Sequence, residues 1–290
     1  MSRRCLRVPY DSYWNIIVWV RRSVAGGRRT RLEVNLSVVH KKHLNRTGSF
    51  MATIEAYSRP SLIYRFREIT DDTIDREIEA IVDRYVFCPT YKEMNDPMEG
   101  NHRESALLKD SPTYGQSIKA VTDALAGFGI ASFSESKSHD PMWAHYAGDF
   151  KGICIAYGLK ALLANLPKKC EFVKMTYNER APILLKNYAT AANRAKLILS
   201  CKSIKWAGER EWRLIRPDRG KASYRKSECV TAVYLGSQIS AAHKKAVVDA
   251  MTKVDIKVYQ MDISSYDIEF KRVPRGRLII RKKQPSTTAK

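Results

Sequence analysis

The stretch Trp206-Ala-Gly-Glu-Arg-Glu-Trp-Arg-Leu-Ile215 decides how this chain of 290 residues is best interpreted. From Glu211 onward it predicts a strand in which charged residues are embedded among apolar ones. If Glu211 begins that strand, the alternation of side chains puts Glu209 and Glu211 on the same side. The stretch therefore predicts an element of a sheet and, on it, a candidate site with two carboxylates.

Short apolar strands and helical patterns lie on both sides of this stretch without a regular strand-helix-strand order. Helices are predicted for 71–85, 116–128, 181–201 and 240–253, with a short one opening at Pro141. The predicted strands are 62–66, 85–88, 130–134, 152–157, 172–177, 211–215, 229–235, 257–261 and 268–273. This order predicts an α+β fold, a single domain over 61–273 with a mixed, mostly antiparallel sheet flanked by helices.

The positive charge is concentrated at the two ends of the chain. Of the formal net charge of +21, residues 1–50 carry +9 and residues 271–290 carry +8, which leaves +4 for 51–270. We expect 1–60 to be a basic, poorly ordered extension and 274–290 a basic tail. Such segments favour contact with nucleic acid through phosphates. Met51 precedes the first well-patterned segment, so translation starting at Met51 is an alternative to Met1.

Cysteine use and hydropathy predict a cytoplasmic protein. The six cysteines are widely spaced and have no partner at a zinc-ligand interval, so we predict neither a metal site nor a disulfide scaffold. The apolar run from Trp14 to Val20 is too short to span a bilayer and is followed at once by two arginines. No membrane association is expected.

Several short motifs occur together in a recognisable order. They are Asn95-Asp96-Pro97 with Glu99, Ser132-Phe133-Ser134-Glu135, Met142-Trp143-Ala144-His145-Tyr146-Ala147, Lys151-Gly152, and Glu209-Arg210-Glu211-Trp212-Arg213 after Lys202 and Trp206. Over about residues 62–235, this combination resembles the bacterial domain of unknown function 2971. The family has no assigned activity. Some members resemble components of phage-defence loci, which implies a role in defence or stress.

A second resemblance concerns chemistry. An arginine on an early strand, a serine pair on a middle strand and Glu-x-Glu on a late strand resemble the arrangement in NAD-dependent ADP-ribosyltransferases. The resemblance implies that Glu211 positions a ribose hydroxyl and stabilises an oxocarbenium-like centre, while Glu209 serves the acceptor. Arg65 would bind the pyrophosphate, and Ser132 or Ser134 would orient the nicotinamide ribose.

This hypothesis makes NAD the candidate co-substrate, and it adds His145 and Tyr146 as candidates for substrate or cofactor binding. The sequence departs from the transferase pattern in two respects. Its serine motif is Ser-Phe-Ser-Glu instead of Ser-Thr-Ser, and Arg67 competes with Arg65 for the first role.

Each candidate residue also has a plain structural explanation. Arg65 and the two serines can be the polar faces of half-buried strands, and the two glutamates can belong to an exposed cluster of ion pairs. His145 can pack in an aromatic corner. The alternative function is a non-catalytic nucleic-acid-associated or protein-interaction module, in which the basic tails supply salt-dependent binding without sequence specificity.

Overall fold

A computed structural model describes residues 18–22, 32–36, 59–186 and 190–274 of the chain. Ten strands of these residues form one sheet, and only one neighbouring pair, β14 with β15, is parallel. The predicted α+β fold with a mixed, mostly antiparallel sheet is thereby confirmed. In spatial order the strands are β16 (Asp267–Arg272), β15 (Lys257–Ser264), β14 (Val230–Leu235), β7 (Ile153–Gly158), β3 (Leu62–Arg67), β6 (Gly129–Ser134), β12 (Glu211–Arg216), β8 (Glu171–Lys174), β1 (Val18–Arg22) and β2 (Leu32–Leu36).

In the described part of the chain, three pairs of short strands lie outside the main sheet. β4 (Tyr85–Cys88) pairs antiparallel with β13 (Gly220–Ser223). β5 (Arg103–Glu104) pairs parallel with β10 (Ile183–Leu184), and β9 (Thr176–Asn178) pairs parallel with β11 (Cys201–Ser203). These small ladders connect the loops that surround the centre of the large sheet.

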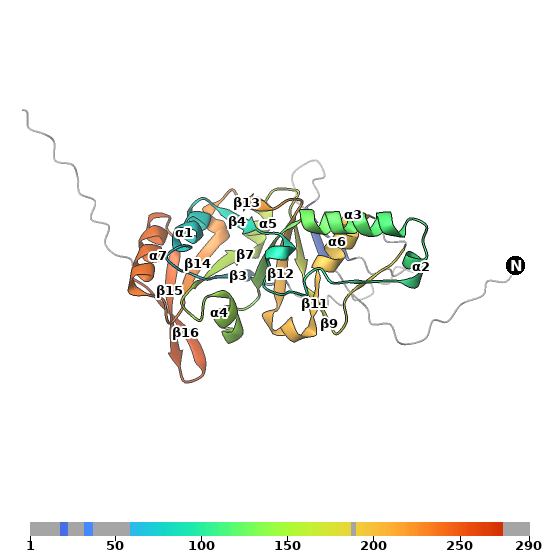
Figure 1. Cartoon of the computed structure of the whole chain (residues 1–290). Coiled ribbons are helices and arrows are strands. Elements are labelled where there is room, and N and C mark those ends of the chain that lie inside the picture. Colours follow the sequence, from blue (N-terminus) through green and yellow to red (C-terminus); the bar gives the residue numbers. More distant parts are fainter. Residues whose placement is uncertain (1–17, 23–31, 37–58, 187–189, 275–290) are drawn as a thin grey trace, which may run out of the picture.

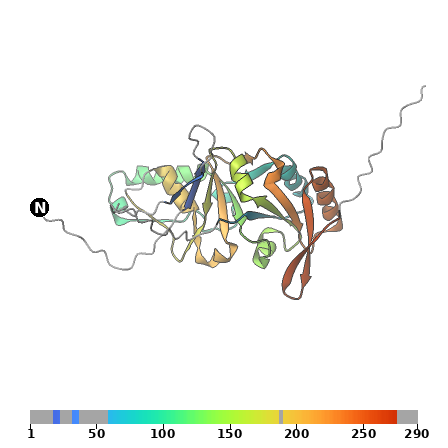
Figure 2. The same ribbon diagram turned by 180° about the vertical axis from the view of Figure 1, so that it is seen from behind.

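The helices divide between the two ends of the sheet (Figure 1). At one end α1 (Ile74–Val82) packs against α7 (Ala241–Lys253), and at the other α3 (Tyr114–Gly127) packs against α6 (Ala191–Leu199). α5 (Leu159–Asn165) follows β7, and the short α2 (Ala106–Lys109) follows β5. The view from behind shows the same separation, with α4 (Asp140–Tyr146) beside the hairpin of β15 and β16 (Figure 2).

Successive side chains of a strand pack into different apolar clusters. On β12, Trp212 and Leu214 join the cluster that includes residues of α1, α5 and α7, whereas Ile215 joins the cluster of α3 and α6. Since neighbouring residues of a strand point to opposite faces, the two clusters cover opposite faces of β12. The charged residues Glu211 and Arg213 lie on the same face as Ile215, which places them beneath α6.

The sheet opens at its centre, between β3 and β6. β3 pairs with β7 along all six of its residues but meets β6 at a single residue pair, Tyr64 with Ser134. β6 is paired in full with β12 on its other side. Because two strands that stop pairing must diverge, the sheet leaves room between β3 and β6 for a cleft.

The predicted helix over 181–201 is wrong in its first half. α6 begins only at Ala191, after the N-cap Thr190. Ile183 and Leu184 instead pair with β5, because Pro182 disfavours helix at the residue before it and the ladder satisfies the backbone. Residues 187–189 lie outside the described residues.

Two short segments of the predicted N-terminal extension are described. Residues 18–22 and 32–36 are strands β1 and β2, and β1 pairs with β8 at Trp19–Val173 and Val20–Phe172. The rest of 1–58 lies outside the described residues. The same holds for 275–290 in the predicted basic tail.

The packing of α4 generates a stability prediction. Trp143 is fully buried, stands edge-on to Phe66 with ring centroids 5.2 Å apart, and donates its indole N–H to the carbonyl of Lys137. Replacing Trp143 with alanine removes a large core side chain and should lower the free energy of unfolding by about 3–5 kcal/mol in urea denaturation. Tyr266→Ala is the control, since Tyr266 is 97% exposed and should shift stability by less than about 0.5 kcal/mol.

Candidate functional site

One cleft passes through the opening between β3 and β6. It contains about 760 Å³ of space, its open mouth included, and takes its lining from β3, β6, α4, the loop after β4 and the segment from Lys202 to Glu211. Five of the candidates from the sequence line it: Arg65, Ser132, Tyr146, Glu209 and Glu211. Residues from distant parts of the chain therefore share one cavity.

Glu211 is the buried carboxylate at the floor of this cleft. Its Oε1 accepts a hydrogen bond from Nε of Arg213 at 2.6 Å, and its Oε2 lies 3.4 Å from Nζ of Lys202. Burial by itself would raise the pKa of Glu211, but the two cations outweigh burial and lower it. Glu211 is therefore held as a carboxylate in a site shielded from bulk water.

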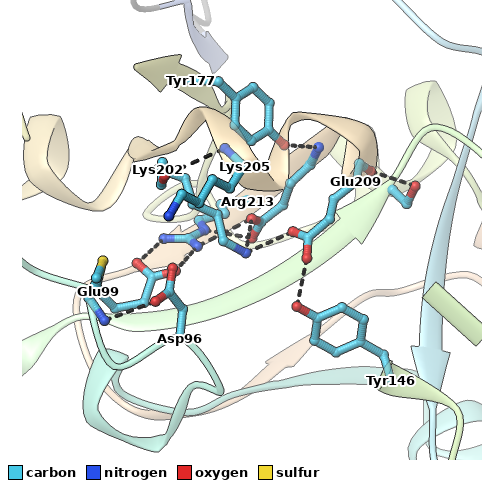
Figure 3. Close-up of polar contacts among 12 residues, drawn as sticks. Asp96, Glu99, Tyr146, Tyr177, Lys202, Lys205, Glu209 and Arg213 are labelled. Atoms are coloured by element: carbon cyan, nitrogen blue, oxygen red, sulfur yellow. Dashed lines mark hydrogen bonds and ion pairs between the residues drawn. The ribbon is translucent and has the colours of Figure 1, made fainter. Parts of the chain in front are cut away.

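Glu209 also lies at the cleft, but strand alternation is not what places it there. It ends the 3-10 helix η2 (Ile204–Glu209), and Arg210 then adopts a left-handed conformation with φ 47°. This turn brings both carboxylates to Lys202, whose Nζ lies 2.7 Å from Oε2 of Glu209. The hydroxyl of Tyr146 donates to Oε1 of Glu209 at 2.7 Å (Figure 3). The two carboxylates thus meet through a turn and not through strand alternation.

Arg213 links the loop before β5, which carries Glu99, to the candidate catalytic residue Glu211. Its guanidinium makes a two-pronged ion pair with Glu99 and donates a hydrogen bond from Nε to Glu211. Its Nη1 also donates a hydrogen bond to the carbonyl of Leu199 at 2.9 Å. It is fully buried, and the charges of Glu211 and Glu99 overcome burial to raise its pKa well above the ordinary value. Every direction in the guanidinium plane is occupied, so Arg213 fixes the carboxylate of Glu211 in one orientation.

The buried cluster carries a formal charge of −1. Three carboxylates, those of Glu99, Glu209 and Glu211, face the two cations Lys202 and Arg213, and all five side chains are at most 8% exposed. An exposed ion-pair cluster, the structural alternative from the sequence, is therefore wrong for the two glutamates. Buried ions cost free energy unless they are fully paired, and a surplus negative charge is complementary to a cationic centre.

Arg65 lies at another wall of the same cleft. Its Nη2 donates to the carbonyl of Phe87 at 2.9 Å, and its guanidinium lies 5.8 Å from the ring centroid of Phe133. Its Nη1 is buried and has no hydrogen-bond partner among the residues that the structure describes. Burial first, and then the neighbouring Arg67, lower its pKa. Arg67 itself is taken up by Glu77, with contacts of 2.6 and 2.8 Å. Of the two arginines that compete for the phosphate-binding role, Arg65 is therefore the one with an unsatisfied N–H group.

The serines have different environments. The hydroxyl of Ser132 is buried next to Glu211, contributes to the low pKa of that carboxylate, and makes no hydrogen bond of normal geometry in the described part of the chain. Ser134 does not line the cleft. Its hydroxyl donates to the carbonyl of Glu209 at 2.7 Å and accepts the N–H of Ser136, so it braces the turn before β12.

His145 is exposed on α4 and also lies outside the lining of the cleft. Its ring contacts Trp206 and Tyr146 at centroid distances of 6.4 and 6.3 Å, the aromatic corner that the sequence offered as its structural explanation. Burial and the hydrogen bond to Glu209 raise the pKa of Tyr146, so its hydroxyl stays protonated at neutral pH. Tyr146 is thus a donor to the carboxylate and not a base.

Three residues of the site were not singled out for chemistry from the sequence. Lys202 and Arg213 were given no chemical role, and Tyr177 was only the last residue of a predicted strand. The hydroxyl oxygen of Tyr177 accepts the backbone N–H of Glu211 at 2.7 Å. A signal was present in Arg213, a charged residue inside an apolar strand, but no pattern in the sequence indicates that Glu99 is its partner.

The comparisons support the family resemblance over part of the chain. Residues 142–214 match the model of a family described as a protein of unknown function (DUF2971). This segment confirms the resemblance and includes Tyr146, Lys202, Glu209, Glu211 and Arg213, whereas Arg65, Glu99 and Ser132 lie before it. No curated protein and no solved structure matches the chain.

Among the described residues, no helix is both long enough and apolar enough to cross a lipid bilayer. In the same ranges, no group of three or more histidine, cysteine, aspartate or glutamate side chains is arranged to hold a metal ion.

The buried cluster predicts a pH-dependent loss of stability on removing Arg213. Arg213→Met leaves Glu99 and Glu211 buried with too few cations and should cost about 3–5 kcal/mol of unfolding free energy at pH 7. Without Arg213, burial should raise the pKa of Glu211 above its value in the unfolded chain. Protonation of Glu211 then favours the folded state, so the deficit should shrink as the pH is lowered from 7 to 5.

Arg219→Met is the matched control, because Arg219 makes the same two-pronged ion pair with Glu93 at the exposed surface. It should cost less than about 1 kcal/mol at either pH. Urea denaturation of both variants at the two pH values makes the comparison, and a deficit in Arg213→Met that does not change with pH would contradict the buried-charge account.

Proposed function

We propose that the cleft binds NAD and that the protein transfers ADP-ribose from it to an acceptor, as an ADP-ribosyltransferase-like enzyme. One observation carries this proposal: a single cleft joins an unpaired cation, Arg65, to a buried carboxylate pair, Glu209 and Glu211. A dinucleotide that breaks its glycosidic bond has the complementary charges, an anionic diphosphate and a developing cation on the ribose.

The environment of Arg65 supports the diphosphate end of the proposal. A buried guanidinium is costly unless its charge and its N–H groups are satisfied. Arg65 has one group bound to a backbone carbonyl, a second without a partner, and no carboxylate in ion-pair contact among the described residues. Phosphate oxygens would satisfy the guanidinium with two parallel hydrogen bonds.

The carboxylate end would stabilise the sugar. When the bond between ribose C1′ and the nicotinamide nitrogen breaks, both bonding electrons leave with nicotinamide, which becomes neutral, and positive charge develops at C1′. Glu211, held ionised by Arg213 and Lys202, would stabilise that charge, and the hydroxyl of Ser132 beside it would bind the ribose. The acceptor then forms the new bond to C1′ and gives its proton to Glu209, from which it passes to water.

We further propose that the enzyme acts in the cytoplasm of a bacterium in defence against phage or stress. The family resemblance implies this setting, and the five cysteines in the described part of the chain are all free thiols, which suits a reducing compartment. In a bacterial host, expression of the full chain should lower phage plating efficiency by at least about tenfold, and Glu211→Gln should abolish the protection. Equal plating with both chains would contradict the role in defence.

The chemistry is tested with Glu211→Gln, which keeps the shape of the side chain and removes its charge. Nicotinamide release from NAD should fall by about 10²–10³-fold, since a positioned charge that stabilises a transition state is worth that much. The measurement is chromatography of nicotinamide after incubation with NAD, alongside circular dichroism to show that the variant is folded. Glu228→Gln, at an exposed ion pair with Lys226, is the control and should leave the rate unchanged.

Arg65→Met separates binding from chemistry. It should raise the KM for NAD by at least about tenfold with a smaller effect on kcat, because the guanidinium is expected to bind the diphosphate in ground state and transition state alike. An absence of nicotinamide release from the wild-type protein, or full activity of Glu211→Gln, would overturn the proposed function.

A further inference from the structure

A second cavity adjoins the cleft on the other side of the charged cluster. It contains about 560 Å³ of space, its open mouth included, and shares the side chains of Asp96, Glu99 and Lys202 with the cleft. In Figure 3, Asp96 and Glu99 lie on one side of Arg213 and Lys202, and Tyr146 lies on the other. The cluster is therefore a wall with a cavity on each face, and only one of these cavities is used by the proposed binding of NAD.

The second cavity contains a donor without a partner. Asn178 ends β9 and is among the residues that line the cavity, and its Nδ2 is buried without a hydrogen-bond partner in the described residues. A buried amide that is left unsatisfied costs about 1–3 kcal/mol, which a ligand with a carbonyl or ring-nitrogen acceptor would recover. Asn178 is therefore a donor at this cavity whose hydrogen bond a ligand could complete.

The same cavity offers an acceptor and further amide groups. One carboxylate oxygen of Asp96 accepts the backbone N–H of Met98 at 2.9 Å, which fixes the orientation of that side chain in the wall. Asn101 and Ser203 add groups that can donate or accept. An unsatisfied amide donor together with a carboxylate acceptor matches the polar edge of a nucleobase, where N–H groups and acceptor atoms alternate.

The charge of the chain favours a nucleic acid over a protein as the source of that base. At the cavity itself the exposed Glu179 and Arg180 balance each other, so the positive charge comes from the terminal segments 1–50 and 271–290, which carry +9 and +8. Polycationic segments bind phosphates without regard to sequence and so raise the local concentration of a strand. A base inside the cavity would have to be unpaired, because its polar edge is otherwise taken up by its complement.

We propose that the second cavity binds one unpaired nucleobase of a nucleic-acid strand and that this strand is the acceptor of ADP-ribose. The acceptor role rests on the proposed function, whereas the binding of the base does not. Lys202 and Glu99 lie between this cavity and the carboxylates of Glu209 and Glu211. A nucleotide bound in the cavity would therefore lie next to the proposed reaction centre.

The experiment measures binding of short fluorescein-labelled single-stranded RNA and DNA to the full chain by anisotropy, in parallel with nicotinamide release from NAD. Asn178→Ala and Asn178→Asp should each weaken single-strand binding by about tenfold. Affinity for single strands should also fall steeply as salt is raised from about 50 to 200 mM. Nicotinamide release to water should stay within about twofold of the wild type in both variants.

Asn193→Ala, an exposed asparagine on α6, is the matched control and should bind as the wild type does. Duplexes of the same sequence should bind with the same salt dependence but should not respond to Asn178→Ala. The inference is overturned if both Asn178 variants bind single strands as tightly as the wild type, or if labelled ADP-ribose is transferred only to added protein. Loss of nicotinamide release in the wild type with binding still dependent on Asn178 would overturn the proposed function and leave the base-binding site in place.

Discussion

The buried guanidinium of Arg213 is the interaction on which the centre of this protein depends. It lies on β12 in the middle of the sheet, and it binds Glu99 from the loop before α2 and Glu211 on its own strand. An ion removed from water in this way is stable only when its partners are in place. The Arg213–Glu99 pair therefore holds the loop against the sheet, and the Arg213–Glu211 pair orients the carboxylate that faces the cleft.

The opening between β3 and β6 leaves a cleft beside these buried charges. Had the two strands paired along their length, the floor of the cleft would have been closed by main-chain hydrogen bonds. Instead β3 is paired with β7 and β6 with β12, and the two halves meet at Tyr64 and Ser134 alone. The sheet thus supplies two rigid walls, and Arg65 stands on one while Ser132 and Glu211 stand on the other. A site on rigid strands can hold its charged groups at fixed positions.

Much of the strand pattern could be predicted from the sequence, because apolar runs bounded by turns carry a strong local signal. The predicted strands at Leu62–Phe66, Tyr85–Cys88 and Ile130–Ser134 agree with β3, β4 and β6 within a residue. The long helix over 181–201 failed, since the pairing of Ile183 with β5 depends on a segment about eighty residues away. Of the site, Glu209 and Glu211 were found because they stand together near apolar residues, while Ser134 and His145 were included on local pattern and lie outside the cleft.

The sequence alone determined the fold class, the family motifs and the separation of a near-neutral body from two basic ends. These properties depend on composition and on patterns within a few residues of each other. The tertiary structure decided that Arg65, Ser132 and Glu211 line one cavity, that Glu99 is the partner of Arg213, and that Lys202 joins the two glutamates. Such pairings join positions far apart along the chain. They are set by strand order and by the cost of burying a charge without its counterion, and neither is written in any short stretch of residues.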